Sequence, residues 1–126
     1  MVRHKVFLSQ EGLVENVYHG DVGYGDLQEV FKQTYALGFK LQDEKKPVNL
    51  LVDLREIGRV SLLGVGSLAT LGIKSFPFNR IAVFGARREI ELMAKLVVGM
   101  AGKRKTLKMF KERVEAVGWL RESGGA

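Results

Sequence analysis

Residues 48–52, which read Val-Asn-Leu-Leu-Val, constrain the fold more than any other part of the sequence. They follow a polar segment that ends at Pro47, where the preceding helical pattern breaks. A nearly continuous apolar run is typical of a strand that is buried on both faces. Such strands occur mainly where helices cover both sides of a sheet, so the run predicts the central strand of an α/β domain.

A hairpin and a helix are predicted ahead of this strand. Residues 6–8 are apolar and residues 13–19 alternate between two faces, which indicates two short strands joined by a turn. Residues 20–26 are rich in turn formers, and apolar side chains then recur at helical spacing. This spacing predicts a helix from about Gly25 to about Leu41.

The rest of the chain alternates between helical and strand patterns. Helices are predicted at 64–74, 89–101 and 111–121, and strands at 80–85 and 106–110. The helix at 89–101 is apolar around most of its circumference, so it is either well buried or in contact with an apolar partner. The predicted order is ββαβαβαβα, a single α/β domain over residues 1–126 with a mixed sheet covered by about four helices. Residues 122–126 are small and polar and predict a flexible tail.

Charge and composition narrow the classes of partner and of chemistry. The formal net charge is +6 and the isoelectric point is near 9.7, which favours anionic partners, although a solvated basic surface would give the same excess. The absence of cysteine excludes disulfides and thiolate sites. The longest uncharged stretch, residues 60–73, is well short of the roughly 20 residues that a membrane-spanning helix needs. The N-terminus has no secretory pattern, so we expect a cytoplasmic protein.

Several of these segments together resemble a known family. They are residues 50–54 (Leu-Leu-Val-Asp-Leu), residues 80–85 (Arg-Ile-Ala-Val-Phe-Gly), and the closing segments 109–110 and 115–120. In order and spacing the chain resembles the SpoIIAA-like family from about Val14 to Leu120, a family whose fold is that of the STAS domain of anti-sigma-factor antagonists. The resemblance implies a non-enzymatic binding or regulatory module.

The resemblance also implies a partner-binding face at the start of the second helix. In phospho-regulated STAS proteins an Asp-Ser pair lies there, and its serine is phosphorylated. By this similarity the pair falls on Ser61 and Leu62, and the Gly-x-Gly that usually follows falls on Gly64 and Gly66. Leucine therefore stands at the acceptor position, while Ser61, one residue earlier, could still carry a phosphate.

A ligand groove is a further implication of the resemblance. The family is similar in fold to the lipid-binding Sec14-like (CRAL-TRIO) domains. This similarity implies an apolar groove under the helices that begin near Gly64 and Glu89, lined by Leu92, Leu96 and Met100. The occupant would be a small amphipathic ligand such as a lipid, with a protein partner as the alternative. An exposed strand edge or apolar helix is also compatible with a homodimer.

The motifs that suggest chemistry are weak. Residues 64–69 (Gly-Val-Gly-Ser-Leu-Ala) match a dinucleotide fingerprint, but about nine residues separate them from Leu54, so no cofactor is expected. His4 and His19 lack a spaced partner for a metal or catalytic site. Asp53 is expected to end the central strand, where it could bond a partner or satisfy backbone donors. We therefore expect that the protein is not an enzyme.

Positive charge is concentrated in the last third of the chain. Candidate anion-binding residues there are Arg87, Arg88, Lys103, Arg104 and Lys105, accompanied by Lys95, Lys108 and Lys111. If the two arginines open a helix, its free amide groups would reinforce an anion site. The alternative function is therefore binding to an anionic membrane surface or to nucleic acid, of which nucleic acid is the weaker because aromatic residues are not interleaved with the charges.

Overall fold

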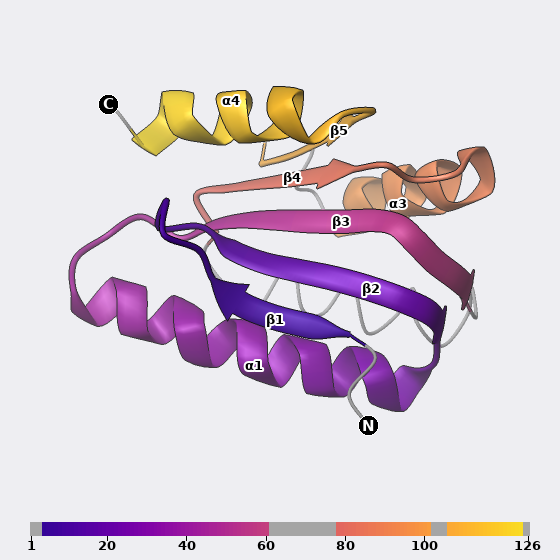
Figure 1. Cartoon of the computed structure of the whole chain (residues 1–126), viewed down its shortest axis with the longest axis horizontal. Coiled ribbons are helices and arrows are strands. Elements are labelled where there is room, and N and C mark those ends of the chain that lie inside the picture. Colours follow the sequence, from indigo (N-terminus) through magenta and orange to yellow (C-terminus); the bar gives the residue numbers. More distant parts are fainter. Residues whose placement is uncertain (1–3, 61–77, 102–105, 125–126) are drawn as a thin grey trace.

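The fold is a mixed five-stranded sheet with helices on both faces, as predicted (Figure 1). The computed structural model describes residues 4–60, 78–101 and 106–124. Within these ranges the elements are β1 (Lys5–Leu8), β2 (Val14–Val22), α1 (Tyr24–Asp43), β3 (Asn49–Val60), β4 (Arg80–Phe84), α3 (Arg88–Ala101), β5 (Leu107–Phe110) and α4 (Arg113–Gly124). The predicted helix at 64–74 lies outside the described residues. The strand order is β1-β2-β3-β4-β5, with β1 antiparallel to β2 and the other pairs parallel.

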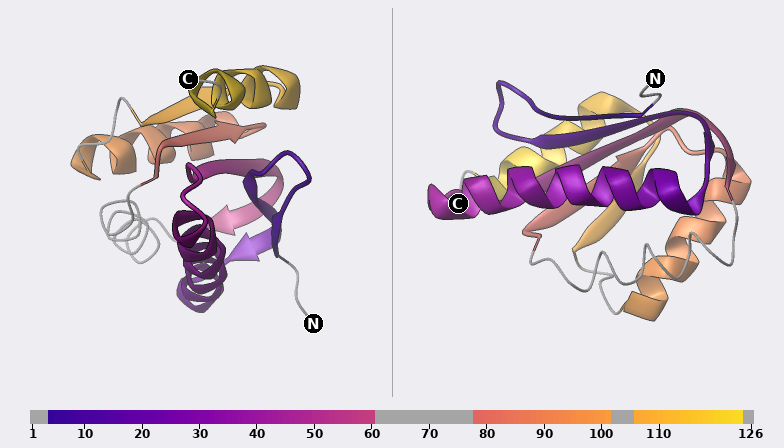
Figure 2. Two further views of the ribbon diagram at one scale, coloured as in Figure 1. Left: turned by 90° about the vertical axis from the view of Figure 1, so that its left-hand side faces the viewer. Right: turned by 90° about the horizontal axis from the view of Figure 1, so that it is seen from below.

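Two hydrophobic cores lie on opposite faces of the sheet. Helices α1 and α3 contribute to one core, and α4 covers part of the other face (Figure 2). Leu50 faces the first core and Leu51 faces the second, because successive side chains of a strand point in opposite directions. The prediction of a central strand buried on both faces is therefore confirmed for the first half of β3.

β3 is longer than its sequence pattern predicts. Val17 pairs with Asp53, but His19 pairs with Glu56, so β3 carries one residue more than β2 at this point. The shift lets Leu54 and Ile57, three residues apart, face the same core. The prediction that Asp53 ends this strand is wrong. Asp53 marks instead the last residue at which β3 pairs with β4.

Other boundaries differ by a few residues from those expected. α4 continues to Gly124, through part of the segment that the sequence indicates as a tail. α1 begins at Tyr24, where the carboxylate of Asp26 accepts a 2.9 Å hydrogen bond from the N–H of Gly23 and meets the positive end of the helix dipole. Among the described residues, no helix is long and apolar enough to cross a membrane.

Candidate functional site

The sheet face that α4 leaves partly open carries buried charge. Glu15 on β2 is only 3% exposed, and its two carboxylate oxygens accept hydrogen bonds of 2.9 and 3.0 Å from Arg113 of α4. The hydrogen bond with Glu15 raises the pKa of Arg113. This bidentate pair joins α4 to a strand on the far side of β3 and therefore helps to place the helix.

A second ion pair lies beside the first on the same face. Oδ1 of Asp53 accepts hydrogen bonds of 3.0 Å from both the backbone N–H and the Nε of Arg55, and Nη2 donates at 2.8 Å to Oδ2. The Arg55 guanidinium also lies over the Phe84 ring, 5.1 Å from its centroid. Both carboxylate oxygens of Asp53 therefore accept hydrogen bonds from Arg55, two residues further along the chain.

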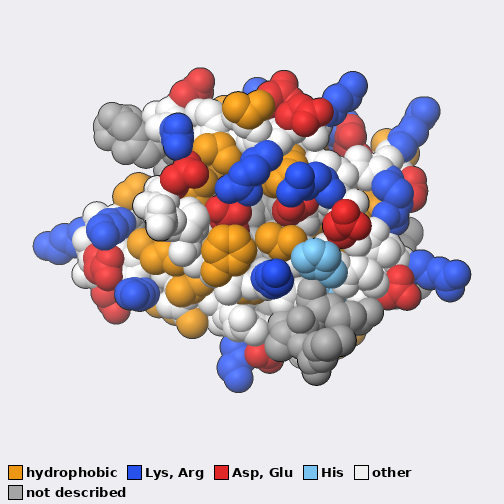
Figure 3. Space-filling view, viewed as in Figure 1, with side chains coloured by type: hydrophobic (Ala, Val, Ile, Leu, Met, Phe, Trp, Pro, Cys, Tyr) orange, Lys and Arg blue, Asp and Glu red, His pale blue; other side chains and the backbone are white. Residues whose placement is uncertain are grey.

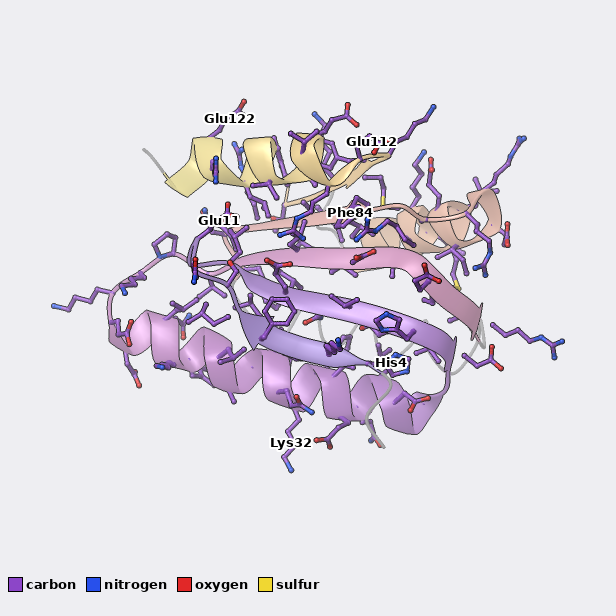
Figure 4. All side chains as sticks on the ribbon, viewed as in Figure 1. His4, Glu11, Lys32, Phe84, Glu112 and Glu122 are labelled. Atoms are coloured by element: carbon purple, nitrogen blue, oxygen red, sulfur yellow. The ribbon has the colours of Figure 1, made fainter. Side chains whose placement is uncertain are left out.

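The environment of Asp53 holds it in the charged form. Burial acts to raise its pKa, but the hydrogen bonds from Arg55 and the charges of Arg55 and Arg113 outweigh burial and lower the pKa below its ordinary value. The hydrogen bond to Asp53 raises the pKa of Arg55, and Glu56 and Glu112 add to that effect. Glu112 and Phe84 are labelled in Figure 4.

The surface around these pairs contains both signs of charge. Figure 3 shows Lys and Arg side chains next to Asp and Glu side chains, beside a hydrophobic area. Because both signs of charge are present there, their fields partly cancel. Of the two buried pairs, Glu15–Arg113 joins α4 to the sheet, whereas Asp53–Arg55 lies within β3.

Arg87 is engaged with the protein rather than held open for an anion. Its guanidinium donates to the carbonyl of Ile57 and, at 2.8 Å, to the carbonyl of Gly58, and Nε bonds Glu89 at 2.6 Å. These contacts tie the start of α3 to the end of β3. Arg88, the first residue of α3, is exposed. Lys103, Arg104 and Lys105 lie outside the described residues.

Of the predicted ligand-lining residues, the structure describes the side chains of Leu92 and Leu96. Leu92 and Leu96 are each 59% exposed, on the side of α3 that faces away from buried Ile90. The side chain of Met100 lies outside those described. Ser61, Leu62, Gly64 and Gly66 also lie outside the described residues, as does the predicted partner face that they form.

A groove does occur elsewhere on α3. It has a volume of about 600 Å³, and its lining comes from this helix and from β5, the strand at the opposite end of the described sheet from β1. Its lining is Glu91 and Lys95 of α3, then Leu107, Lys108, Met109, Phe110 and Lys111. Below we call it the β5 groove. The lining includes all four residues of β5 and Lys111 after it. Because neighbouring strand residues point to opposite faces, a groove that touches all four runs along the edge of the strand.

The β5 groove combines an apolar floor with positive charge. Leu107 and Met109 pack toward the core shared by α1 and α3, whereas Phe110 packs toward the core under α4. Lys108 lies over the Phe110 ring, 5.5 Å from its centroid, and Lys95 bonds Glu91 at 3.0 Å. With Lys111, three lysines face a single glutamate in the lining, so the groove favours anionic groups.

The sequence gives partial signals for these features. A glutamate between Leu13 and Val17 on one strand face indicates a buried charge that needs a partner, but nothing local identifies Arg113. Lysines at an apolar strand are typical of a sheet edge, which Lys108 occupies. Among the described residues, no group of His, Asp and Glu side chains is arranged to hold a metal ion.

Comparison with known proteins gives one family and one solved fold. A sequence model described as SpoIIAA-like matches residues 13–121. The chain is similar to the crystal structure of an uncharacterized protein of the DUF3478 family with a SpoIIAA-like fold, from Shewanella loihica PV-4. The identity is 22%, the TM-score is 0.62, and the match covers 93% of this chain and 91% of that one. No curated protein matches the sequence.

Proposed function

Because the chain belongs to the SpoIIAA-like family, whose fold suggests a regulatory or binding module, we propose that it binds a protein partner at the β5 groove without catalysing a reaction. The observation that carries this proposal is the shape of the groove. It runs along an edge strand and is lined by exposed lysines as well as by apolar side chains. Small-molecule sites normally bury most of their ligand, whereas a channel beside a strand suits a segment of another chain.

The chemistry of the buried carboxylates supports a binding role. Glu15 and Asp53, the acidic side chains that are buried on the open sheet face among the described residues, are each held by an arginine through two or more hydrogen bonds. A carboxylate in such a pair is poorly suited to act as a general base near neutral pH. The Glu15–Arg113 pair instead joins α4 to the sheet, and Arg55 holds Asp53 while it lies over the Phe84 ring, which is consistent with a module that presents a surface.

A small amphipathic ligand is a second candidate for the same groove. A volume of about 600 Å³ lies within the range of ligand sites. The apolar floor would hold an alkyl chain, and Lys95, Lys108 and Lys111 would hold a carboxylate or phosphate head. Leu92 and Leu96, exposed on the same helix, favour a third role, docking of α3 onto an anionic membrane surface.

We also propose, from the family resemblance alone, a partner face at Ser61, Leu62, Gly64 and Gly66. Phosphorylation of Ser61 would add negative charge close to the end of β3. If this face and the β5 groove bind the same partner, Ser61→Glu should change partner capture, whereas Ser61→Ala should not.

Site-specific photo-crosslinking in the cells that express the protein tests the function. A photoreactive phenylalanine replaces Lys95, which lines the β5 groove, and in a control it replaces Val114, which is 78% exposed on α4. A protein adduct that forms from position 95 and disappears with Lys108→Glu/Lys111→Glu supports the proposal. Adducts that form equally from position 114, or that survive the charge reversal, contradict the choice of site.

Native mass spectrometry of the purified protein separates the remaining candidates. A small mass that is retained in gentle conditions and lost on denaturation favours the amphipathic ligand. The same spectrum reports whether the protein is a monomer or a homodimer.

A further inference from the structure

We propose that the partner enters the β5 groove as an extended acidic segment and pairs with β5 as an additional strand of the sheet. This inference rests on the proposed function, because it specifies how a protein partner would occupy that groove. It depends on three features of the described residues: the direction of the backbone groups of β5, the charge beside them and the apolar side chains around them.

The backbone of β5 presents hydrogen-bonding groups on its outer side. Ile81 N–H donates to the carbonyl of Thr106 at 2.8 Å, and Gly85 N–H donates to the carbonyl of Phe110 at 3.2 Å. In a parallel ladder the residues between these acceptors alternate in direction. The N–H and C=O groups of Leu107 and Met109 therefore point away from β4.

These outward groups lie where a further strand would pair. In the part of the chain that the structure describes, β4 is the one sheet neighbour of β5. An edge with N–H and C=O groups presented in sequence is a template for strand addition. The β5 groove leaves room for a chain at this edge, because its lining follows the strand from Leu107 to Lys111.

Charge selects which chain can add. Lys108 and Lys111 are both exposed on the strand side of the groove, and Lys95 is exposed on the helix side. Two copies of the protein joined edge to edge at β5 would bring their lysines together, and such like-charge contacts are unfavourable. A segment with glutamate or aspartate would instead form opposite-charge contacts, so an acidic partner is favoured over a second copy.

Apolar contacts set the pattern of the segment. Leu107 and Met109 present apolar surface on the α3 side of β5, and Phe110 does so on the α4 side. Side chains of an added strand alternate between these two sides. The favoured sequence therefore mixes acidic residues with apolar, strand-forming residues such as valine.

A set of synthetic peptides tests strand addition directly. The probe is a short fluorescent peptide of alternating glutamate and valine, blocked at both ends. One control replaces each glutamate with lysine. The second control is a pair of peptides that keep every side chain but carry N-methyl groups on one or the other set of alternate amides. Each of the two lacks the N–H donors of one edge and cannot pair on that side. Affinities are measured by fluorescence anisotropy at low salt, because surface charge contacts are screened at high salt.

We expect the glutamate peptide to bind at least tenfold more tightly than the lysine peptide. It should also bind at least tenfold more tightly than the peptide whose N-methyl groups lie on the edge that pairs with β5. Lys108→Glu/Lys111→Glu should weaken its binding at least tenfold. Lys32→Glu, which changes an exposed lysine of α1 labelled in Figure 4, should leave the affinity unchanged. Binding should also slow hydrogen exchange of the Leu107 and Met109 amides.

The outcomes separate this inference from the function on which it rests. If the unmethylated peptide and the peptides methylated on either edge bind with equal affinity, side chains alone hold the segment. This result overturns strand addition but leaves the groove as a binding site. Failure of the glutamate peptide to bind, or binding without protection of Leu107 and Met109, also overturns it. The proposed function fails separately, if crosslinking from position 95 captures no lysine-dependent partner.

Discussion

Arg113, the first residue of α4, donates two hydrogen bonds to Glu15 of β2, at 2.9 and 3.0 Å. α4 packs mainly over β3, β4 and β5, so this pair extends its attachment to a strand beyond them. The carboxylate is almost completely buried, while the guanidinium is partly exposed. The position of α4 on the sheet therefore depends on a charge pair as well as on Ala116 and Leu120.

Removing Arg113 alone should destabilise the fold. Arg113→Met leaves Glu15 buried without its partner, and we expect a loss of about 2 to 3 kcal/mol in the free energy of unfolding. The double variant Glu15→Leu/Arg113→Met removes both charges and should recover most of this loss. Urea unfolding with an unchanged m-value measures the effect. A double variant no more stable than the single one would show that the pair is not the cause.

Stability should fall in acid through Asp53. Its folded-state pKa lies below the ordinary value of 3.8, so the charged form contributes stability above that pH, and the contribution is lost as the pH falls toward the folded-state pKa. Asp53→Asn should be less stable than the parent near pH 7, and the difference should shrink below about pH 4. Urea midpoints of both proteins across this range provide the measurement. A difference independent of pH would contradict the role of the charge.

Gly85 should tolerate no side chain. Its φ is +76°, and a Cβ would come within 2.3 Å of Cγ of Arg55. Gly85→Ala therefore adds a steric clash to backbone strain, and we expect a loss of about 2 kcal/mol or more. Gly12→Ala is the matched control, because Gly12 has a φ of +82° and nothing within 4 Å of its Cβ position.

The cause of the Gly85 effect can be isolated in a second background. Arg55→Ala removes the Cγ atom and leaves the backbone N and Cα of residue 55 at 3.3 and 3.4 Å from the Cβ position, so the added cost of Gly85→Ala should fall but stay above that of Gly12→Ala. Thermal or urea unfolding of the four proteins reports the coupling. If the cost of Gly85→Ala is the same with and without Arg55, strain alone explains it.

Arg87 should hold the end of β3 rather than bind anions. Arg87→Lys cannot donate simultaneously to the carbonyls of Ile57 and Gly58 with the same geometry. We expect faster hydrogen exchange at the amides of residues 57–60, with little change in β4. Added phosphate should change the melting temperatures of the parent protein and of the Arg87→Lys variant equally. If phosphate raises the melting temperature of the parent protein and Arg87→Lys removes this rise, the prediction is contradicted and Arg87 binds an anion.

Sequence patterns predict the helices and strands here better than they predict the contacts between them. Alternation and helical spacing depend on residues close in the chain, and these identify β2, α1, β4 and the buried half of β3. These patterns do not predict the extension of β3 past Asp53, because Arg55 and Glu56 are consecutive charged residues of the kind that is typical of a loop. What keeps the extension in the sheet is pairing with residues 19–22 of β2.

The candidate site shows the same limit. A basic last third of the chain is evident from composition, but which lysines share a surface depends on where β5 lies. Lys95, Lys108 and Lys111 meet at one groove, whereas Arg87 turns back to β3. The apolar sequence of α3 likewise does not indicate which of its apolar side chains are buried.

The two apolar sides of α3 should therefore respond differently to substitution. Ile90 is buried in the core, so Ile90→Ala should cost about 2 to 4 kcal/mol in the free energy of unfolding. Leu92→Ser/Leu96→Ser changes side chains that are 59% exposed, and we expect a change of about 0.5 kcal/mol or less. If α3 docks onto anionic membranes, the double variant should also bind less to vesicles that contain phosphatidylserine, whereas a groove-directed peptide should bind it normally. A large loss of stability in the double variant would instead show that Leu92 and Leu96 are covered in the folded protein, and the membrane role would lose its support.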